Sequence, residues 1–293
     1  MSASERSVFL SKPRVIYYSD ERNDEFSAAQ ITPKKIDGNY VYCHDSRFKK
    51  FTHFFWYRNI FTPIAFFYTK IKFHHRIVGK EKLREYGDSG YFIYGNHTQD
   101  IGDAFIPNML NLPKDNYVIV HPNNVSMPLL GKITPSLGAL PLPDDLKAYR
   151  NFMSAIERRI SEKCAVVIYP EAHIWPYYTG IRRFPDTSFH YPVKLGVPTF
   201  CFTNTYKKRR GSKKAQIVTY IDGPFFPNTD LPLREQKKEL CDRVYRCMSE
   251  RAECSDICVI NYIKCSRGDF PNSEAVPEQA ETQNNESEVN DTK

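Results

Sequence analysis

The sequence lacks the glycine-rich signatures of the common nucleotide-binding sites. It has no GxGxxG segment after an expected strand and no GxxxxGK segment followed by Ser or Thr. The usual signals of dinucleotide-binding and Walker-type proteins are therefore missing. It also has no GxSxG segment, which argues against an ordinary serine hydrolase. Any site must be sought among other residues.

Cysteine pairs of the kind that zinc sites use are missing too. The chain has eight Cys, and no CxxC spacing occurs among the five near its C-terminus: Cys241, Cys247, Cys254, Cys258 and Cys265. We therefore expect neither a metal site nor a disulfide scaffold. The opening segment MSASERSVFLSKPR lacks an apolar signal core, so we expect a reducing, cytoplasmic setting.

The aromatic segment Phe51–Ile77 does not form one continuous hydrophobic run. Its longest uncharged stretch lies between Arg58 and Lys70 and contains Pro63, so it is too short for a spanning helix. An aromatic-rich helical pair with basic flanks fits an element that lies in the membrane interface. An aromatic helix packed on the domain core is the alternative.

Charge is distributed unevenly along the 293 residues, whose net charge is +7. The segment from Pro271 to Lys293 contains six acidic residues and one lysine, so this tail has a net charge of −5 and the remaining residues have +12. A basic body suggests an anionic partner: a phospholipid surface, coenzyme A phosphates or nucleic acid. The run KKRRGSKK at 207–214 is either part of that contact or a solvated loop.

Short apolar runs alternate with helical stretches after Lys80. Helices are expected over 146–162 and 233–253. Strands are expected within 90–97, which ends in a loop, within 164–172, where the strand stops at Pro170-Glu171, and over 117–122, 199–206 and 216–224. Strands that are apolar throughout favour an α/β fold, a mixed, largely parallel sheet covered by helices. We expect an N-terminal extension over 1–50, a domain over 51–265 with interfacial helices at about 51–77, and a disordered acidic tail over 266–293.

Polar residues follow two of these strands, where open α/β sheets tend to place their sites. They are Asn96, His97, Asp100 and Asp103 after the first strand, and Glu171 and His173 after another. A histidine with a carboxylate nearby is either a structural pair or a base and its orienting partner. The carboxylate holds one ring nitrogen and leaves the other to take a proton from a hydroxyl.

Four segments in order, NHTQDIGDAF, VSMPLLGKITPSLGALPL, VVIYPEAH and VKLGVPTF, resemble the four blocks of the glycerolipid acyltransferase family. That family includes glycerol-3-phosphate and lysophosphatidic acid acyltransferases. The resemblance covers roughly Phe54 to Ser249, including the strand that leads into DGPFF. It implies acyl transfer by a general base, without a metal or a cofactor.

The resemblance also implies roles for individual residues. His97 is the general base. The family's orienting aspartate usually lies five residues after the histidine, where this sequence has Gly102; Asp103 is favoured, and Asp100 is the alternative. Glu171 matches the glutamate that holds the acyl-acceptor pocket together. Residues assigned to substrate binding beside it are Asn96, Gly131 and Gly138, the two glycines shaping acceptor access.

Two arginines of the family pattern are absent. The third block reads PEAHI instead of PEGTR, and the second lacks its closing arginine. Arg182 and Arg183 are candidates to replace one of them at the acceptor phosphate, or they are a solvated pair. The acceptor is therefore left open between a glycerol phosphate and a lysophospholipid.

The expected reaction moves a fatty acyl group from acyl-CoA, or from acyl carrier protein, to a hydroxyl of such an acceptor. Expected partners are a membrane lipid surface and these substrates, without nucleic acid. The expected location is peripheral, on the cytoplasmic face of a membrane. The alternatives are a thioesterase or hydrolase that uses His97 with water, and a non-catalytic basic protein that binds lipid or nucleic acid.

Overall fold

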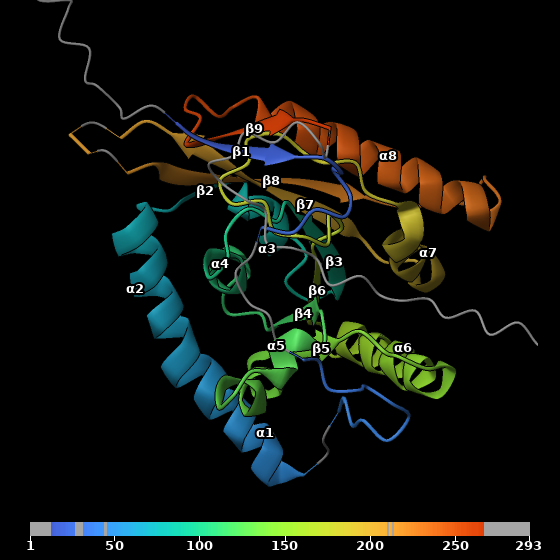
Figure 1. Ribbon diagram of the computed structural model, residues 1–293. Helices are drawn as coiled ribbons and strands as arrows, with labels where there is room; N and C mark the ends of the chain where they lie inside the picture. The colour runs from blue at the N-terminus through green and yellow to red at the C-terminus, as the bar shows by residue number, and fades with distance from the viewer. Residues whose placement is uncertain (1–12, 27–31, 44–45, 210, 213, 267–293) are drawn as a thin grey trace, which may run out of the picture.

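The computed structural model describes residues 13–26, 32–43, 46–209, 211–212 and 214–266. The predicted acidic tail lies outside these residues from residue 267 onward. A seven-stranded sheet forms the centre, in the order β2-β8-β7-β3-β6-β4-β5, and only the β7–β8 pair is antiparallel (Figure 1). The predicted mixed, largely parallel sheet is thus confirmed. Its strands are β2 (Arg76–Val78), β3 (Tyr91–Gly95), β4 (Asn116–Val120), β5 (Ala139–Pro141), β6 (Ala165–Ile168), β7 (Thr199–Lys207) and β8 (Gln216–Phe225).

Helices cover both faces of this sheet, which is why β3 and β6 are buried along their whole length. Alternate residues of β3 enter different cores: Phe92 and Tyr94 join one cluster, and Tyr91 and Ile93 join the other. The first cluster receives α6 (Leu146–Ser161), α7 (His190–Leu195) and α8 (Leu233–Ala252). The second receives α3 (Lys80–Arg84), α4 (Gly102–Leu110) and Phe73 of α2 (Thr62–Phe73).

The connection between β4 and β6 contains three short helical segments before β5 and α6. They are α5 (Asn123–Ser126), η2 (Leu130–Lys132) and η3 (Thr134–Leu137). A further short helix, η4 (Asp186–Phe189), leads into α7 and packs against α8.

A second, two-stranded sheet joins the two ends of the described chain. Strand β1 (Arg14–Tyr18) pairs in parallel with β9 (Ile260–Lys264), and the sequence pattern predicted neither strand. Trp175, which is fully buried, stacks on Tyr262 of β9 with ring centroids 4.8 Å apart. The small sheet therefore covers the loop that follows β6.

One continuous helical arm spans Arg47–Phe73, where the sequence suggested a helical pair. It consists of α1 (Arg47–Phe54), a π-helical segment η1 (Phe55–Phe61) and α2, and the residues at both junctions have helical dihedral angles. Pro63 has no N–H to donate, and the wider π turn precedes it. The Thr62 hydroxyl donates to the carbonyl oxygen of Tyr57 (2.7 Å) at this point.

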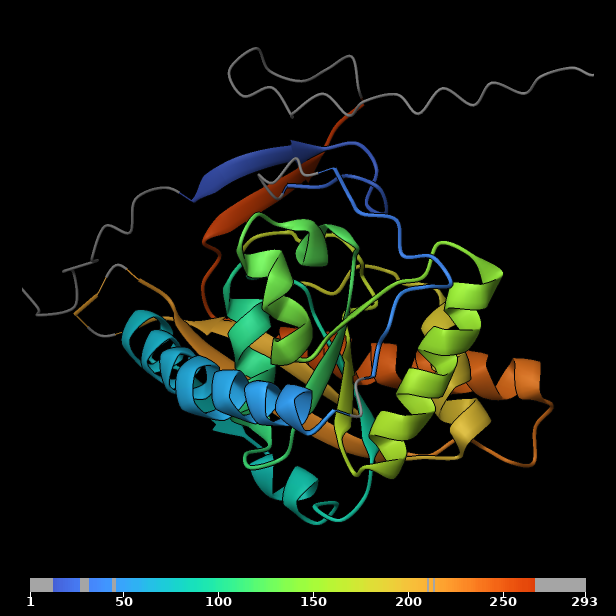
Figure 2. The same cartoon turned by 90° about the horizontal axis from the view of Figure 1, so that it is seen from below.

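The arm has an inner face packed on the domain and an exposed apolar patch. On the inner face the Tyr57 hydroxyl, in a side chain 1% exposed, accepts the Asn116 N–H (2.9 Å). Figure 2 shows the arm lying along the outside of the body. Among the described residues, no helix is both long and apolar enough to cross a bilayer. The apolar patch of the arm consists of Phe48, Phe51, Phe54, Phe55, Trp56, Ile64, Phe66, Phe67 and Ile71.

The arm ends at two histidines that lead into β2. His74 adopts a left-handed conformation (φ 45°), and its neighbour His75 is 3% exposed. The His75 N–H donates to the carbonyl oxygen of Thr69 (3.1 Å), and His75 Nε2 lies 2.7 Å from the Thr219 hydroxyl oxygen. Burial, together with the nearby charges of Lys70 and Lys80, lowers the pKa of His75 to about 4.

We predict that His75 makes the folded state sensitive to acid. An unfolded histidine has a pKa of about 6.5. Because the folded value is lower, His75 stabilises the fold fully above about pH 6.5, and this contribution is lost as the pH falls toward 4. The shift corresponds to a loss on the order of 3 kcal/mol. Replacement by glutamine, His75→Gln, should remove this dependence while keeping an amide donor near the Nε2 position.

Urea denaturation of the parent and of His75→Gln between about pH 7 and pH 4.5 tests this prediction. The exposed His121, changed to glutamine, serves as the control for loss of a histidine. A difference in unfolding free energy between parent and His75→Gln that stays constant with pH would contradict the prediction.

Candidate active site

The site lies on two loops that follow the neighbouring parallel strands β3 and β6. His97 follows β3, and Glu171 follows β6. The Trp175 N–H donates to the carbonyl oxygen of His97 (3.1 Å), and the Tyr177 N–H donates to that of Thr98 (3.0 Å). Backbone hydrogen bonds therefore join the two loops at the carboxyl ends of their strands, where open α/β folds place their sites.

His97 and Asp103 form a hydrogen-bonded pair. Nδ1 of His97 lies 2.8 Å from Oδ2 of Asp103, which is 2% exposed in the first turn of α4. The same carboxylate oxygen accepts the backbone N–H of Gln99 (2.8 Å). Burial raises the pKa of Asp103, while the hydrogen bonds from His97 and Gln99 act in the opposite direction. With Asp103 as acceptor, His97 carries its proton on Nδ1.

The other nitrogen of His97 is available for chemistry. The His97 side chain is 17% exposed, and its ring stacks on Tyr169 with centroids 4.4 Å apart. Across the part of the chain that the structure describes, Nε2 has no hydrogen-bond partner. A neutral imidazole oriented in this way can accept a proton from a hydroxyl that approaches Nε2.

Asp100, the alternative orienting residue, is exposed and makes no hydrogen bond to His97 among the described residues. The geometry therefore favours Asp103. Gly102, at the position usual for the family's aspartate, is tightly packed. A Cβ there would lie 2.8 Å from the Gln99 Cβ and 3.1 Å from the Phe73 ring, which leaves no room for a carboxylate side chain.

Glu171 holds the two loops together through its buried carboxylate. Oε2 accepts the His97 N–H (2.9 Å), and Oε1 accepts the Arg182 N–H (2.8 Å). The Arg182 guanidinium lies 3.6 Å from Oε2 in the described structure. Burial raises the pKa of Glu171, and the charge of Arg182 opposes that effect. Glu171 thus fixes the backbone of His97 directly.

The structure favours a bracing role for Arg182 over the acceptor-binding role considered from the sequence. Its side chain is 1% exposed, and its guanidinium donates to the carbonyl oxygens of His173 and of Glu21 (3.4 Å). Arg183 is exposed, but its guanidinium lies 4.0 Å from the ring of Tyr245 on α8. That helix covers the face of the sheet opposite to α4.

Three other residues assigned to substrate binding have packing roles in the structure. Asn96 is 1% exposed and exchanges two hydrogen bonds with the backbone of Asn204 (2.8 and 3.0 Å). A Cβ on Gly131 would lie 2.5 Å from a carbonyl oxygen. A Cβ on Gly138, which has φ +92°, would lie 2.4 Å from another. Contact of these residues with an acceptor stays a prediction.

Two residues near the His97–Asp103 pair, called the dyad below, were not predicted from the sequence. Tyr169 lies immediately before the PEAH segment, and its hydroxyl donates to the backbone oxygen of Asp103 (2.6 Å). Asn204 lies within the buried strand β7 and donates to Asp103 Oδ1 (3.4 Å). The usable signal for Asn204 was an amide inside a strand otherwise expected to be buried.

The comparison with protein-family models agrees with the resemblance drawn from the ordered blocks. Residues 74–204, which include His97, Asp103 and Glu171, match the family model described as Acyltransferase. The predicted resemblance to acyltransferases is confirmed at this level. The curated proteins gave no match. Among solved structures, one similar chain is the 1-acyl-sn-glycerophosphate (LPA) acyltransferase PlsC from Thermotoga maritima. The two chains are 18% identical, the match covers 69% of this chain and 79% of that chain, and the TM-score is 0.47.

We predict that Glu171→Gln destabilises the fold. Glutamine has one acceptor oxygen, so one of the N–H groups that Glu171 holds loses its partner, and Arg182 loses its counter-ion. Such a change at a buried ion pair costs about 3–5 kcal/mol. The control is Glu162→Gln, at an exposed carboxylate paired with Arg158 and Arg159, where the cost is about 1 kcal/mol or less. Equal losses in urea denaturation would contradict the bracing role of Glu171.

Proposed function

We propose, from the acyltransferase family match over residues 74–204, that the protein transfers a fatty acyl group from an acyl thioester to a hydroxyl. The acceptor that we propose is a glycerol phosphate or a lysophospholipid. The observation that carries this proposal is the 2.8 Å pairing of His97 Nδ1 with Asp103, which leaves Nε2 toward an incoming group. The donor would be acyl-CoA or an acyl carrier protein, and the reaction needs no cofactor.

In this mechanism His97 Nε2 takes the proton of the acceptor hydroxyl as its oxygen attacks the thioester carbonyl. A carbon–oxygen bond forms, the carbon–sulfur bond breaks, and the leaving thiolate receives the proton from the imidazolium. Asp103 stabilises that imidazolium through the Nδ1 hydrogen bond. The His97 N–H is already held by Glu171, so other backbone amides near the PEAH segment would stabilise the oxyanion.

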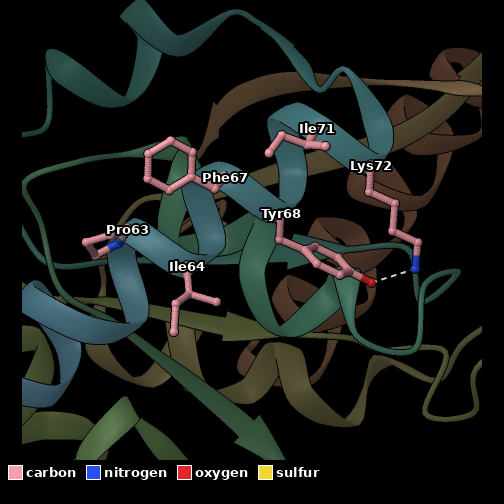
Figure 3. Close-up of a pocket in the computed structure, with 6 residues that line it drawn as sticks. All are labelled: Pro63, Ile64, Phe67, Tyr68, Ile71 and Lys72. Atoms are coloured by element: carbon pink, nitrogen blue, oxygen red, sulfur yellow. Dashed lines mark hydrogen bonds between the residues drawn. The ribbon is translucent and has the colours of Figure 1, made fainter.

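The helical arm supports a membrane location for this chemistry. Its apolar patch includes Phe67 and Ile71, which are 59% and 72% exposed. These two residues and Tyr68 help to line a shallow depression of about 430 Å³ on α2 (Figure 3). Burial of such side chains in an apolar phase contributes about 1.5–3 kcal/mol each when complete. Exposed basic side chains beside the patch are Arg47, Lys49, Lys50, Lys70, Lys72 and Arg76.

The arm lies next to the dyad, so a lipid-bound arm would bring lipid substrates close to His97. The ring of Phe73, the last residue of the arm, lies beside Gly102 at the start of α4. Phe61 and Tyr68 of the arm contact Phe105 of α4, each with ring centroids 5.1 Å apart. We therefore propose a peripheral location on the cytoplasmic face of a membrane.

We propose that the basic run 207–214 makes a further contact with the anionic membrane surface, although Arg210 and Lys213 lie outside the described residues. Lys207, the first residue of this run, pairs with Asp256 (3.8 Å).

The thioesterase alternative uses the same His97 with water, and the fate of the acyl group distinguishes hydrolysis from transfer. The non-catalytic alternatives predict binding to lipid or nucleic acid without thioester turnover.

We predict that His97→Ala lowers kcat by about 100- to 10,000-fold, the usual contribution of a positioned general base. Asp103→Asn should reduce kcat in the same direction, because the amide changes the tautomer that His97 adopts. Asp100→Asn is the control and should leave kcat within about threefold of the parent, since general-base catalysis does not involve this side chain. The assay follows thiol release from acyl-CoA with a panel of lyso-acceptors. Parent-like transfer by His97→Ala would refute the mechanism.

We also predict that the double variant Phe67→Glu, Ile71→Glu binds vesicles at least about tenfold more weakly than the parent, because charges enter the apolar patch of the arm. Vesicles of phosphatidylcholine and phosphatidylglycerol are the probe, in a sedimentation assay. The control is Leu146→Glu, Leu233→Glu, at two residues that are 79% and 69% exposed elsewhere on the surface. Equal losses in the two double variants would contradict a specific role for the arm.

A further inference from the structure

A buried network of hydrogen bonds leads from Asp103 away from His97. Asn204 Nδ2 donates to Asp103 Oδ1 (3.4 Å), and the Thr219 hydroxyl donates to Asn204 Oδ1 (2.6 Å). His75 Nε2 lies 2.7 Å from the same hydroxyl oxygen. The four side chains, Asp103, Asn204, Thr219 and His75, are each 3% exposed or less. They are called the buried network below.

The sheet itself aligns the members of this network. Asn204 of β7 and Thr219 of β8 are paired residues in the antiparallel register. Thr219 also faces Ile77 of β2, two residues after His75. Asn204 is held in place by the two hydrogen bonds between its backbone and the Asn96 side chain. The arrangement therefore follows from strand register, and the residues concerned are far apart in the sequence.

The direction of each hydrogen bond follows from the charge of Asp103. As a carboxylate it only accepts, so Asn204 must present its NH₂ group to Asp103 and its oxygen to Thr219. The single Thr219 proton then goes to Asn204, and Thr219 must accept from His75. Burial lowers the pKa of His75 to about 4, so the ring is neutral near pH 7. The network thus requires the His75 proton to be on Nε2.

We propose that Asn204, Thr219 and His75 are positioning residues that orient Asp103 for its action on His97. This inference rests on the proposed function, in which Asp103 orients the general base. Asp103 Oδ2 is occupied by His97 and Gln99, and Asn204 occupies Oδ1. With both oxygens held, the carboxylate cannot turn about its last torsion without leaving a buried donor unpaired, which is unfavourable.

The buried network also ties the dyad to the helical arm. The backbone N–H of His75 donates to Thr69 of the arm (3.1 Å), and Lys70 Nζ donates to the His75 carbonyl oxygen (2.9 Å). The last turn of the arm and the orienting carboxylate therefore belong to one set of hydrogen bonds. In a lipid-bound protein, this set fixes the placement of the base relative to the arm.

Thr219→Val tests the positioning role, because valine keeps the shape of threonine and lacks its hydroxyl. We expect kcat to fall about tenfold with little change in KM, the effect of losing roughly one hydrogen bond. Thr219→Ser should restore most of the loss. The matched control is Thr203→Val on β7, at an equally buried threonine whose hydroxyl has no partner within the described residues. A Thr219→Val enzyme as active as Thr203→Val would overturn the proposal.

Nitrogen-15 NMR of histidine-labelled protein tests the same network without any turnover. The His75 signal, identified by its absence in His75→Gln, should show a neutral ring with the proton on Nε2 near pH 7. Thr219→Val should shift that signal, and Thr203→Val should not. A proton on Nδ1, or a charged ring, would overturn the proposal. If the parent protein shows no acyl transfer, the proposed function fails, and the NMR result still decides whether the buried network exists.

Discussion

Glu171 accepts hydrogen bonds from the backbone N–H groups of His97 and Arg182 with its two carboxylate oxygens. A carboxylate this deeply buried is stable only with such partners and with a nearby cation, which Arg182 supplies. His97 lies beyond β3 in an irregular loop, where its N–H takes no part in strand pairing. Without Glu171 this N–H would therefore lose its hydrogen-bond partner. The position of the proposed base therefore depends on a residue that does not contact the reacting atoms in the proposed mechanism.

The rest of the site follows from the order of strands in the sheet. Because β3 lies between β6 and β7, the His97 loop receives Glu171 from one side and Asn204 from the other. The first turn of α4 then returns Asp103 to the His97 ring. Three strands that are adjacent in the sheet, β6, β3 and β7, therefore position the base, the carboxylate that braces it and the amide that supports Asp103.

The sequence was sufficient where the signal was local. His97 and Asp103 are six residues apart, and the fully apolar strands β3 and β6 could be predicted because helices cover both of their faces. Strands β1 and β9 were missed because they are partly exposed, so their apolar residues do not form a distinct run. The continuity of the arm could not be predicted, since a proline usually ends a helix and here follows a π turn.

The role of Arg182 and the contacts of His75 could not be predicted from sequence patterns, for a different reason. From its charge alone, Arg182 was a candidate for an acceptor phosphate or for a solvated pair, and its burial depends on how two irregular loops meet. His75 and Thr219 are 144 residues apart, and only the alignment of β2 with β8 brings them together.

The central claim, that His97 activates an alcohol and not water, is tested most directly by following the acyl group itself. The parent protein is given a thioester labelled in its acyl carbonyl carbon, together with lysophospholipid vesicles, and the products are separated. The account predicts that the label enters an ester of the acceptor in the same amount as the thiol released. Label recovered as free fatty acid, with the acceptor unchanged, would contradict it.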